Sequence, residues 1–177
     1  MNDYKKIHIS IGSNIGNKLK NLEKAIELIH LKIAVVESIS SIYKTEAIGF
    51  KGEDFLNICI SMFSNEIPSY IMQNLLDIEK ILGRVRNKKN KPESRIIDID
   101  IVFIEEIVIN SSLLQVPHPK MQNRKFVLKP LLEIDPKINH PITKESIPEM
   151  LRNCKDTSQV EKTNLKVFNP KNNLKIS

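Results

Sequence analysis

The first thirty residues change from a two-residue to a helical pattern of apolar positions. Isoleucine occupies every second position from residue 7 to residue 11, and this alternation predicts a strand. Apolar residues then recur three and four positions apart, which predicts a helix over residues 18–30. The glycine-bounded segment 12–16 between them lacks the spacing of lysine and hydroxyl found in phosphate-binding loops. We therefore interpret it as a tight turn, with Asn17 near the cap of the helix.

Two more strands and a second helix follow. β-Branched residues are frequent in segment 34–45 and apolar residues in segment 55–63, so we expect two antiparallel neighbouring strands. The polar stretch 45–54 is interpreted as the loop between them. From Pro68 to Gly83 the apolar residues form one stripe at helical spacing, between a residue that can open a helix and one that can end it. This segment predicts the second helix.

The chain from residue 95 completes the pattern. We expect a strand in the stretch 95–103, a short partner strand at residues 107–109, an extended turn at residues 116–119, and a partly helical segment at residues 121–133. The order strand, helix, strand, strand, helix, strand is typical of the ferredoxin-like α+β fold, an antiparallel sheet with helices packed on its faces.

The length and composition indicate one domain. With 177 residues and 41% hydrophobic content, the chain can bury one sizeable core. We assign residues 1–160 to this domain and interpret the polar residues 161–177 as a C-terminal tail or linker. No apolar run approaches the roughly 20 residues of a membrane helix, so we expect a cytoplasmic protein that does not contact a membrane. Cys59 and Cys154 fit neither a metal spacing nor a disulfide framework, and we expect both to be reduced.

Two carboxylates stand two residues apart in the strand expected in the stretch 95–103. Side chains alternate along a strand, so Asp98 and Asp100 project from the same face, roughly 7 Å apart. Their mutual repulsion favours a cation between them, and magnesium binds through one or two carboxylates together with substrate phosphates. Taken alone, the pair also fits the solvated face of an edge strand.

A basic loop comes just before this pair. Residues 83–95 carry six basic residues and one acidic residue, Glu93, in a chain whose formal net charge is +6. Guanidinium groups bind phosphate oxygens, so a basic loop beside two aspartates favours a polyphosphate and its metal over an ordinary solvated charge run. A pI near 9.2 also permits nucleic-acid binding, but 5% aromatic residues and no Trp offer little for stacking on bases. We therefore expect small acidic substrates and no nucleic acid.

Several motifs follow one another along the chain: Ile11-Gly12-Ser13-Asn14-Ile15-Gly16, Leu56-Asn57, Gly83-Arg84-Val85-Arg86, Arg95-Ile96-Ile97-Asp98-Ile99-Asp100 and Val116-Pro117-His118-Pro119. In this order they resemble a known family, 6-hydroxymethyl-7,8-dihydropterin pyrophosphokinase of folate biosynthesis, and the likeness extends from about residue 7 to residue 135. The resemblance implies a ferredoxin-like fold. It also implies transfer of pyrophosphate from ATP to the hydroxymethyl group of the pterin, with release of AMP.

The resemblance assigns roles to the charged residues. Asp98 and Asp100 would be ligands of two Mg²⁺ ions that bridge the phosphates of ATP, the co-substrate. Arg84 and Arg95 would bind the phosphates and stabilise charge in the transition state. Asp100 is our candidate for orienting or deprotonating the attacking hydroxyl. Further ATP-binding residues implied by the resemblance are Glu79, near the ribose, Arg86 and His118. The pterin-binding residues that it implies are Thr45, Phe55, Asn57 and Phe126.

The sequence differs from the family's motif in one segment, and three other functions are compatible with it. Family members often carry Trp-Gly-Pro before the motif arginine, where this chain has Pro92, Glu93 and Ser94, so closure of that loop is not predicted. We expect a monomer, and leave open fusion to, or association with, a further folate-pathway enzyme. The alternatives are an RNA-binding module, an enzyme that attacks the α-phosphorus of ATP as nucleotidyltransferases or cyclases do, and a catalytically idle relative.

Overall fold

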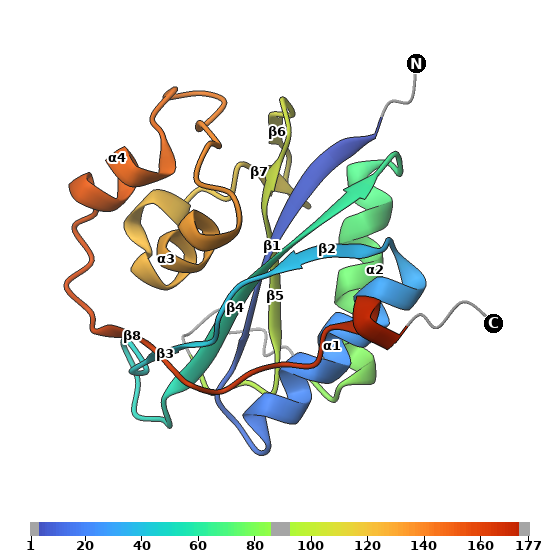
Figure 1. Cartoon of the computed structure of the whole chain (residues 1–177), viewed down its shortest axis with the longest axis vertical. Helices are drawn as coiled ribbons and strands as arrows, with labels where there is room; N and C mark the ends of the chain where they lie inside the picture. Colours follow the sequence, from blue (N-terminus) through green and yellow to red (C-terminus); the bar gives the residue numbers. More distant parts are fainter. Residues whose placement is uncertain (1–3, 86–92, 174–177) are drawn as a thin grey trace.

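The computed structural model describes residues 4–85 and 93–173. Its secondary structure consists of these elements: β1 (Lys5–Ser13), α1 (Lys18–Lys32), β2 (Val36–Ile39), β3 (Tyr43–Thr45), β4 (Phe55–Ser64), α2 (Pro68–Ile81), β5 (Asp98–Ile104), β6 (Ile109–Asn110), β7 (Gln115–Val116), η1 (Met121–Asn123), α3 (Lys125–Ile134), α4 (Ile147–Asn153), β8 (Val160–Lys162) and η2 (Pro170–Asn173). The main sheet has six strands in the order β5-β1-β4-β3-β8, with β2 also paired to β4 (Figure 1). All these pairs are antiparallel.

Helices cover both faces of this sheet, as predicted for the ferredoxin-like α+β fold. The isoleucines of β1 point to one face and pack with the buried stripes of α1 and α2. The other face packs against α3 and α4 through a second apolar cluster that includes Cys59 and Phe103. Figure 1 shows α1 and α2 on one side and α3 and α4 on the other. Period-two alternation therefore gives each central strand two buried faces.

The turn between β1 and α1 agrees with its interpretation from the sequence. Asn17 is the N-cap of α1, and its side chain accepts a hydrogen bond from Lys20 N at 3.1 Å. Gly16 has a φ of 67°, a left-handed conformation that glycine adopts without steric cost. Both observations identify the segment as a tight turn with a capped helix start.

Two expected strands differ in the structure. The single strand expected at residues 34–45 is divided into β2 and β3, because the hydroxyl of Ser40 accepts a hydrogen bond from Cys59 N at 3.0 Å between them. The strand expected at residues 107–109 was placed next to the acidic strand, but β6 pairs with β7 instead. The chain turns away after β5 at Glu106, whose φ is 57°. Pairing with β7 then follows across a short turn.

The C-terminal residues form more structure than their polar composition predicted. Segment 161–177 was interpreted as a tail or linker, but β8 pairs with β3, and Thr163 N donates to Ile42 O at 2.9 Å. Further along, Phe168 N donates to a carboxylate oxygen of Glu23 on α1 at 3.1 Å. Figure 1 shows this segment crossing towards α1. Backbone pairing, which composition does not reveal, holds the described part of the segment to the domain.

Two further expectations concern membranes and cysteines. Within residues 4–85 and 93–173, no helix combines the length and apolar character needed to cross a bilayer. Cys59 is buried, Cys154 is half-buried, and both are free thiols, as predicted.

Candidate active site

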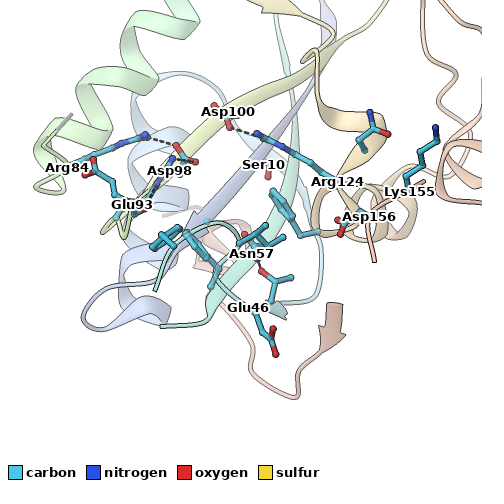
Figure 2. Close-up of a pocket in the computed structure, with 18 residues that line it drawn as sticks. Ser10, Glu46, Asn57, Arg84, Glu93, Asp98, Asp100, Arg124, Lys155 and Asp156 are labelled. Carbon is cyan, nitrogen blue, oxygen red and sulfur yellow. Dashed lines mark hydrogen bonds and ion pairs between the residues drawn. The ribbon is translucent and has the colours of Figure 1, made fainter. Parts of the chain in front are cut away.

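A cavity of about 830 Å³ opens over the central strands beside the start of α3 (Figure 2). In the sheet, Gly12 of β1 is opposite Asp98 of β5 and Asn57 of β4, and Ser10 is opposite Asp100. Residues opposite one another in a sheet project from the same face, so this register brings both aspartates and the amide to one cavity. The cavity is lined by Ser10, Gly12, Thr45, Glu46, Ile48, Phe50, Phe55, Asn57, Arg84, Glu93, Arg95, Asp98, Asp100, Asn123, Arg124, Phe126, Lys155 and Asp156.

Asp98 lies between two of the predicted arginines. Its Oδ1 accepts a hydrogen bond from Arg84 Nη1 at 2.5 Å, and its Oδ2 accepts one from Arg95 Nη1 at 2.7 Å. Arg84 follows α2 and Arg95 precedes β5, so the two side chains reach the carboxylate from different segments. The structure therefore joins three of the predicted site residues in one charge-assisted network.

Glu79 lies beneath this network rather than on the surface of the cavity. Its side chain is only 2% exposed, and Oε1 accepts hydrogen bonds from Arg84 Nη1 and from Ile99 N, the latter at 2.8 Å. Burial lowers the pKa of Arg84, but the carboxylates of Asp98 and Glu79 outweigh this effect and raise it above its ordinary value. Glu79 contacts Arg84, and neither cavity includes it among its lining residues, although the resemblance implied a position near the ribose.

Asp100 is in a different electrostatic environment. Its Oδ2 lies 3.9 Å from Arg124 Nη1 and 4.0 Å from His118 Nε2, both longer than a hydrogen bond. Burial raises the pKa of Asp100 to about 6, and the negative charge of Asp98 adds to this shift, while Arg124 opposes it. The carboxylate of Asp100 is therefore less well compensated by nearby cations than that of Asp98, which accepts hydrogen bonds from two arginines.

The donor set fits magnesium bound together with phosphates. Asp98 and Asp100 offer carboxylate oxygens on one face of β5, and the repulsion between their charges, which adds to the effect of burial on the pKa of Asp100, favours a cation between them. Among residues 4–85 and 93–173, no three His, Cys, Asp or Glu side chains converge to hold a metal by themselves. Magnesium commonly takes one or two protein carboxylates and completes its shell with phosphate oxygens and water. The pair therefore fits a metal that binds with a nucleotide.

The other end of the cavity is aromatic. Phe55 at the start of β4 and Phe126 in the first turn of α3, the two rings that the resemblance assigned to the pterin, are both half-buried and line the cavity. Phe50 joins them, with its ring edge-to-face on Phe55 at a centroid distance of 6.3 Å. The guanidinium of Arg124 lies over the ring of Phe126, 5.6 Å from its centroid. These rings can enclose a flat heterocycle.

A buried amide lies between this aromatic end and the sheet. Asn57 Nδ2 donates a hydrogen bond to Thr45 Oγ1 at 2.9 Å, and both side chains are buried. A Cβ atom on Gly12 would lie 2.8 Å from Asn57 Oδ1, so only glycine leaves room for the amide in this position. The predicted residues Thr45 and Asn57 are thus held together, and the amide can offer a donor and an acceptor to a ligand.

His118 lies in a second, smaller cavity of about 380 Å³. This cavity shares Asp100 with the first, and its walls also include Leu113 and Gln115 near β7. Burial lowers the pKa of His118 to about 4, with a further contribution from Arg124, so the imidazole is neutral at neutral pH. The predicted residue Arg86 lies outside the described residues.

Sequence reasoning missed several residues that line or support the main cavity. Arg124 and Phe50 belong to no motif that was recognised, and Lys155 and Asp156 lie in the stretch after α4, far from the motifs in sequence. The signal for Arg124 was its position two residues before the predicted Phe126, at the start of a helix.

Asn14 was interpreted only as part of a tight turn. It is 1% exposed, and its Oδ1 accepts a hydrogen bond from Arg95 N at 2.7 Å. Its Nδ2 donates to Glu53 O and to Ser94 Oγ, both at 3.1 Å. Asn14 therefore joins the turn after β1 to the loop before β4 and to the segment that carries Arg95.

Known proteins share the motifs that build this cavity. The family model for 7,8-dihydro-6-hydroxymethylpterin-pyrophosphokinase (HPPK) matches residues 8–136, which include both aspartates, Arg84 and Arg95. The chain belongs to the HPPK family. As a member, it is an ATP-dependent pyrophosphokinase, a transferase of folate biosynthesis. The motifs quoted from the sequence had implied this family, and the match confirms it.

Relatives of similar length support this assignment. The 2-amino-4-hydroxy-6-hydroxymethyldihydropteridine pyrophosphokinase of Bacillus subtilis is 36% identical over 157 residues, which cover 87% of this chain and 93% of that protein. The enzyme of the same name from Aquifex aeolicus is 35% identical over 144 residues, covering 81% of this chain and 88% of that protein. HPPK-family enzymes of comparable length are thus similar to most of this chain.

Other relatives are much longer. Folic acid synthesis protein fol1 of Pneumocystis carinii is 40% identical over 146 residues, which cover 82% of this chain but only 20% of that protein. The crystal structure of Plasmodium falciparum HPPK-DHPS superposes with a TM-score of 0.67 at 15% identity, covering 86% of this chain and 45% of that chain. At this identity the superposition shows the shared ferredoxin-like fold and not a shared specificity.

Proposed function

We propose that this HPPK-family chain transfers the diphosphate of ATP in one in-line step, with two magnesium ions held between Asp98, Asp100 and the phosphates. The observation that carries the proposal is the register of β1, β4 and β5. It brings the two carboxylates and the amide of Asn57 to one face of the sheet, and two arginines and the aromatic rings line the same cavity. Phosphoryl-type transfers depend mainly on such positioning and on electrostatic stabilisation.

The pterin fits the aromatic end of the main cavity. The rings of Phe55 and Phe126 would stack on the two faces of the heterocycle, and Asn57 would bind its amide-like edge. The bond from Asn57 Nδ2 to Thr45 fixes the amide orientation before the substrate arrives. This pose would direct the hydroxymethyl group towards Asp98 and Asp100, which line the same cavity.

The nucleoside of ATP fits the smaller cavity. That cavity is lined by Leu113, Leu114 and Met72, which can cover a base, and by the neutral imidazole of His118. Because Asp100 lies in both cavities, a nucleotide bound there would extend its phosphates towards the aspartates. The two substrates would then meet at the metal-binding carboxylates.

The arginines would change partners when ATP binds. Both oxygens of Asp98 face arginine guanidinium groups in the structure, so magnesium ligation requires Arg84 and Arg95 to turn from the carboxylate to the phosphates. Glu79 would keep its hydrogen bond to Arg84 during this exchange, because the Glu79 carboxylate is buried and lies outside the cavity. We assign Glu79 the role of a positioning residue for Arg84.

The reaction can be written as one displacement at phosphorus. The hydroxymethyl oxygen forms a bond to the β-phosphorus, and the bond from the β-phosphorus to the oxygen bridging it to the α-phosphorus breaks, so AMP leaves. The hydroxyl proton passes to Asp100 or to water, and no covalent enzyme intermediate is needed. Bound magnesium supplies charge neutralisation on the phosphates and on the leaving oxygen. Arg84 and Arg95 would stabilise the charge that spreads over the transferred group.

Product analysis tests this proposal directly. The purified protein is incubated with ATP, Mg²⁺ and 6-hydroxymethyl-7,8-dihydropterin, and the products are followed by ³¹P NMR. The proposal predicts AMP and a diphosphorylated pterin in equal amounts, formed only when pterin and metal are both present. Formation of ADP, or of free pyrophosphate with an adenylated pterin, would show attack at another phosphorus and overturn the proposal.

A further inference from the structure

The connection between α4 and β8 reaches the candidate site, although it lies outside residues 8–136 that the family model matches. Lys155 and Asp156 in this connection line the main cavity. Figure 2 shows Asp156 on the same side of the cavity as Arg124. Residues late in the chain therefore form part of the wall where the pterin is proposed to bind.

The helix α3 in this wall begins without a capping side chain of its own. Its N-cap residue is Arg124, whose side chain makes no capping hydrogen bond. Asp156 supplies the missing acceptor, because its Oδ2 accepts a hydrogen bond from Lys125 N at 2.9 Å. Its Oδ1 accepts a bond from Ser158 N, also at 2.9 Å, which orients the carboxylate. A carboxylate at a helix start satisfies a free amide and interacts favourably with the helix dipole.

A second contact joins the same connection to α3. Lys129 Nζ donates a hydrogen bond to Val160 O at 2.8 Å, one turn further along the helix. Val160 in turn is opposite Thr45 in the pairing of β8 with β3. Segment 156–160 thus links the helix that carries Phe126 to the strand that carries Thr45, and both residues line the cavity.

From these contacts we propose that Asp156 is a positioning residue for pterin binding. By capping α3 it fixes the first turn of the helix, and with it the ring of Phe126 and the guanidinium of Arg124 that lies over this ring. The inference rests on the proposed function, because it assumes that the aromatic end holds the pterin. It predicts that loss of the cap affects pterin binding more than ATP binding, since no α3 residue lines the smaller cavity.

Steady-state kinetics of Asp156→Ala and Asp156→Asn test this split. We expect Asp156→Ala to raise KM for the pterin about tenfold and to change KM for ATP less than about threefold, in line with the loss of one helix cap. Asp156→Asn keeps one acceptor oxygen, which can accept the bond from Lys125 N but not the bond from Ser158 N as well, so its pterin KM should lie between those of Asp156→Ala and wild type. The matched control is Ser146→Ala, which removes the capping box of the neighbouring helix α4 outside the cavity and should leave both KM values unchanged.

Amide hydrogen exchange tests the geometry without any turnover. We expect Asp156→Ala to speed exchange about tenfold at residues 125–128, whereas Ser146→Ala should speed exchange only in α4. An unchanged pterin KM, equal increases in both KM values, or unchanged exchange at the start of α3 would each overturn the role of Asp156. If the wild-type protein forms no AMP with pterin, the proposed function fails, and the exchange result alone then decides whether Asp156 fixes α3.

Discussion

Glu79 offers the sharpest test of how the site is built, because it lies beneath the arginine network and outside both cavities. The substitution Glu79→Gln keeps the side-chain size and an oxygen that can accept the bond from Ile99 N. It removes the negative charge beside Arg84. Since Glu79 is 2% exposed, water provides little screening of this pair. A hydrogen bond to a charged group contributes about 1.5–3 kcal/mol, and Asp98 still balances part of the arginine charge. We therefore expect the free energy of unfolding to fall by about 2 kcal/mol.

The same substitution should affect catalysis through Arg84. An arginine retained only by Asp98 must give up its last carboxylate partner when magnesium and phosphates bind, so its position becomes less defined. We expect kcat to fall about tenfold, equal to about 1.4 kcal/mol, while KM for ATP stays within about threefold. Urea unfolding measures the stability and AMP formation measures the kinetics. Asp77→Asn is the matched control, because Asp77 is exposed on the same helix, where its side chain accepts a hydrogen bond from Gln73.

Each outcome for Glu79→Gln has a defined meaning. An unfolding free energy within about 0.5 kcal/mol of wild type, as expected for the Asp77→Asn control, would refute the claim that the buried pair is important. A loss of stability with unchanged kcat would refute the positioning role. A large rise in KM for ATP with unchanged kcat would instead support the ribose contact that the family resemblance implied.

Four other perturbations give clear expectations. Asp100→Ala should abolish AMP formation while circular dichroism shows an intact fold, and residual turnover in a folded variant would contradict its role. Because burial raises the pKa of Asp100 to about 6, protons compete with magnesium below that pH, so titrations at low metal concentration should show affinity falling from pH 7 to pH 5. Burial lowers the pKa of His8 from 6.5 to about 4. Between these pH values the unfolded chain binds a proton at His8 and the folded protein does not. The free energy of unfolding should therefore fall by about 3 kcal/mol between pH 6.5 and pH 4. The variant His8→Gln should flatten that decline in chemical denaturation. Gly12→Ala would place a methyl group 2.8 Å from Asn57 Oδ1 and should raise KM for the pterin at least about tenfold, with a smaller effect on KM for ATP.

Much of the fold could be predicted because its signals are local. Alternating isoleucines identified β1, and helical spacing between Pro68 and Gly83 identified α2. The division of one expected strand into β2 and β3 could not be predicted, because it depends on a bond from Cys59 N to the hydroxyl of Ser40, nineteen residues away. β8 was not predicted for a similar reason, because its backbone pairing with β3 cannot be inferred from its polar composition.

The residues of the candidate site also fall into two groups, those that local motifs predict and those that depend on long-range contacts. Asp98 and Asp100 could be identified from spacing along one strand, and Arg95 from its position in the same motif. Asp156 could not, because its bond to Lys125 N spans 31 residues and depends on how the chain returns after α4. The depth of Glu79 was also not predictable, since helix periodicity shows which face is buried but not that an arginine lies above it. Long-range contacts of this kind decide which charged residues face the ligand and which support it.

Two metal ions between Asp98, Asp100 and the phosphates are the central feature of the proposed mechanism. The direct measurement is anomalous X-ray scattering from crystals grown with Mn²⁺, the pterin and α,β-methylene-ATP, in which the scissile bond is replaced by one that cannot react. We expect two manganese peaks, each contacting a phosphate oxygen and at least one of the two aspartates, with Arg84 and Arg95 turned to the phosphates. A single peak, or peaks that contact neither aspartate while both ligands are bound, would contradict the two-metal mechanism.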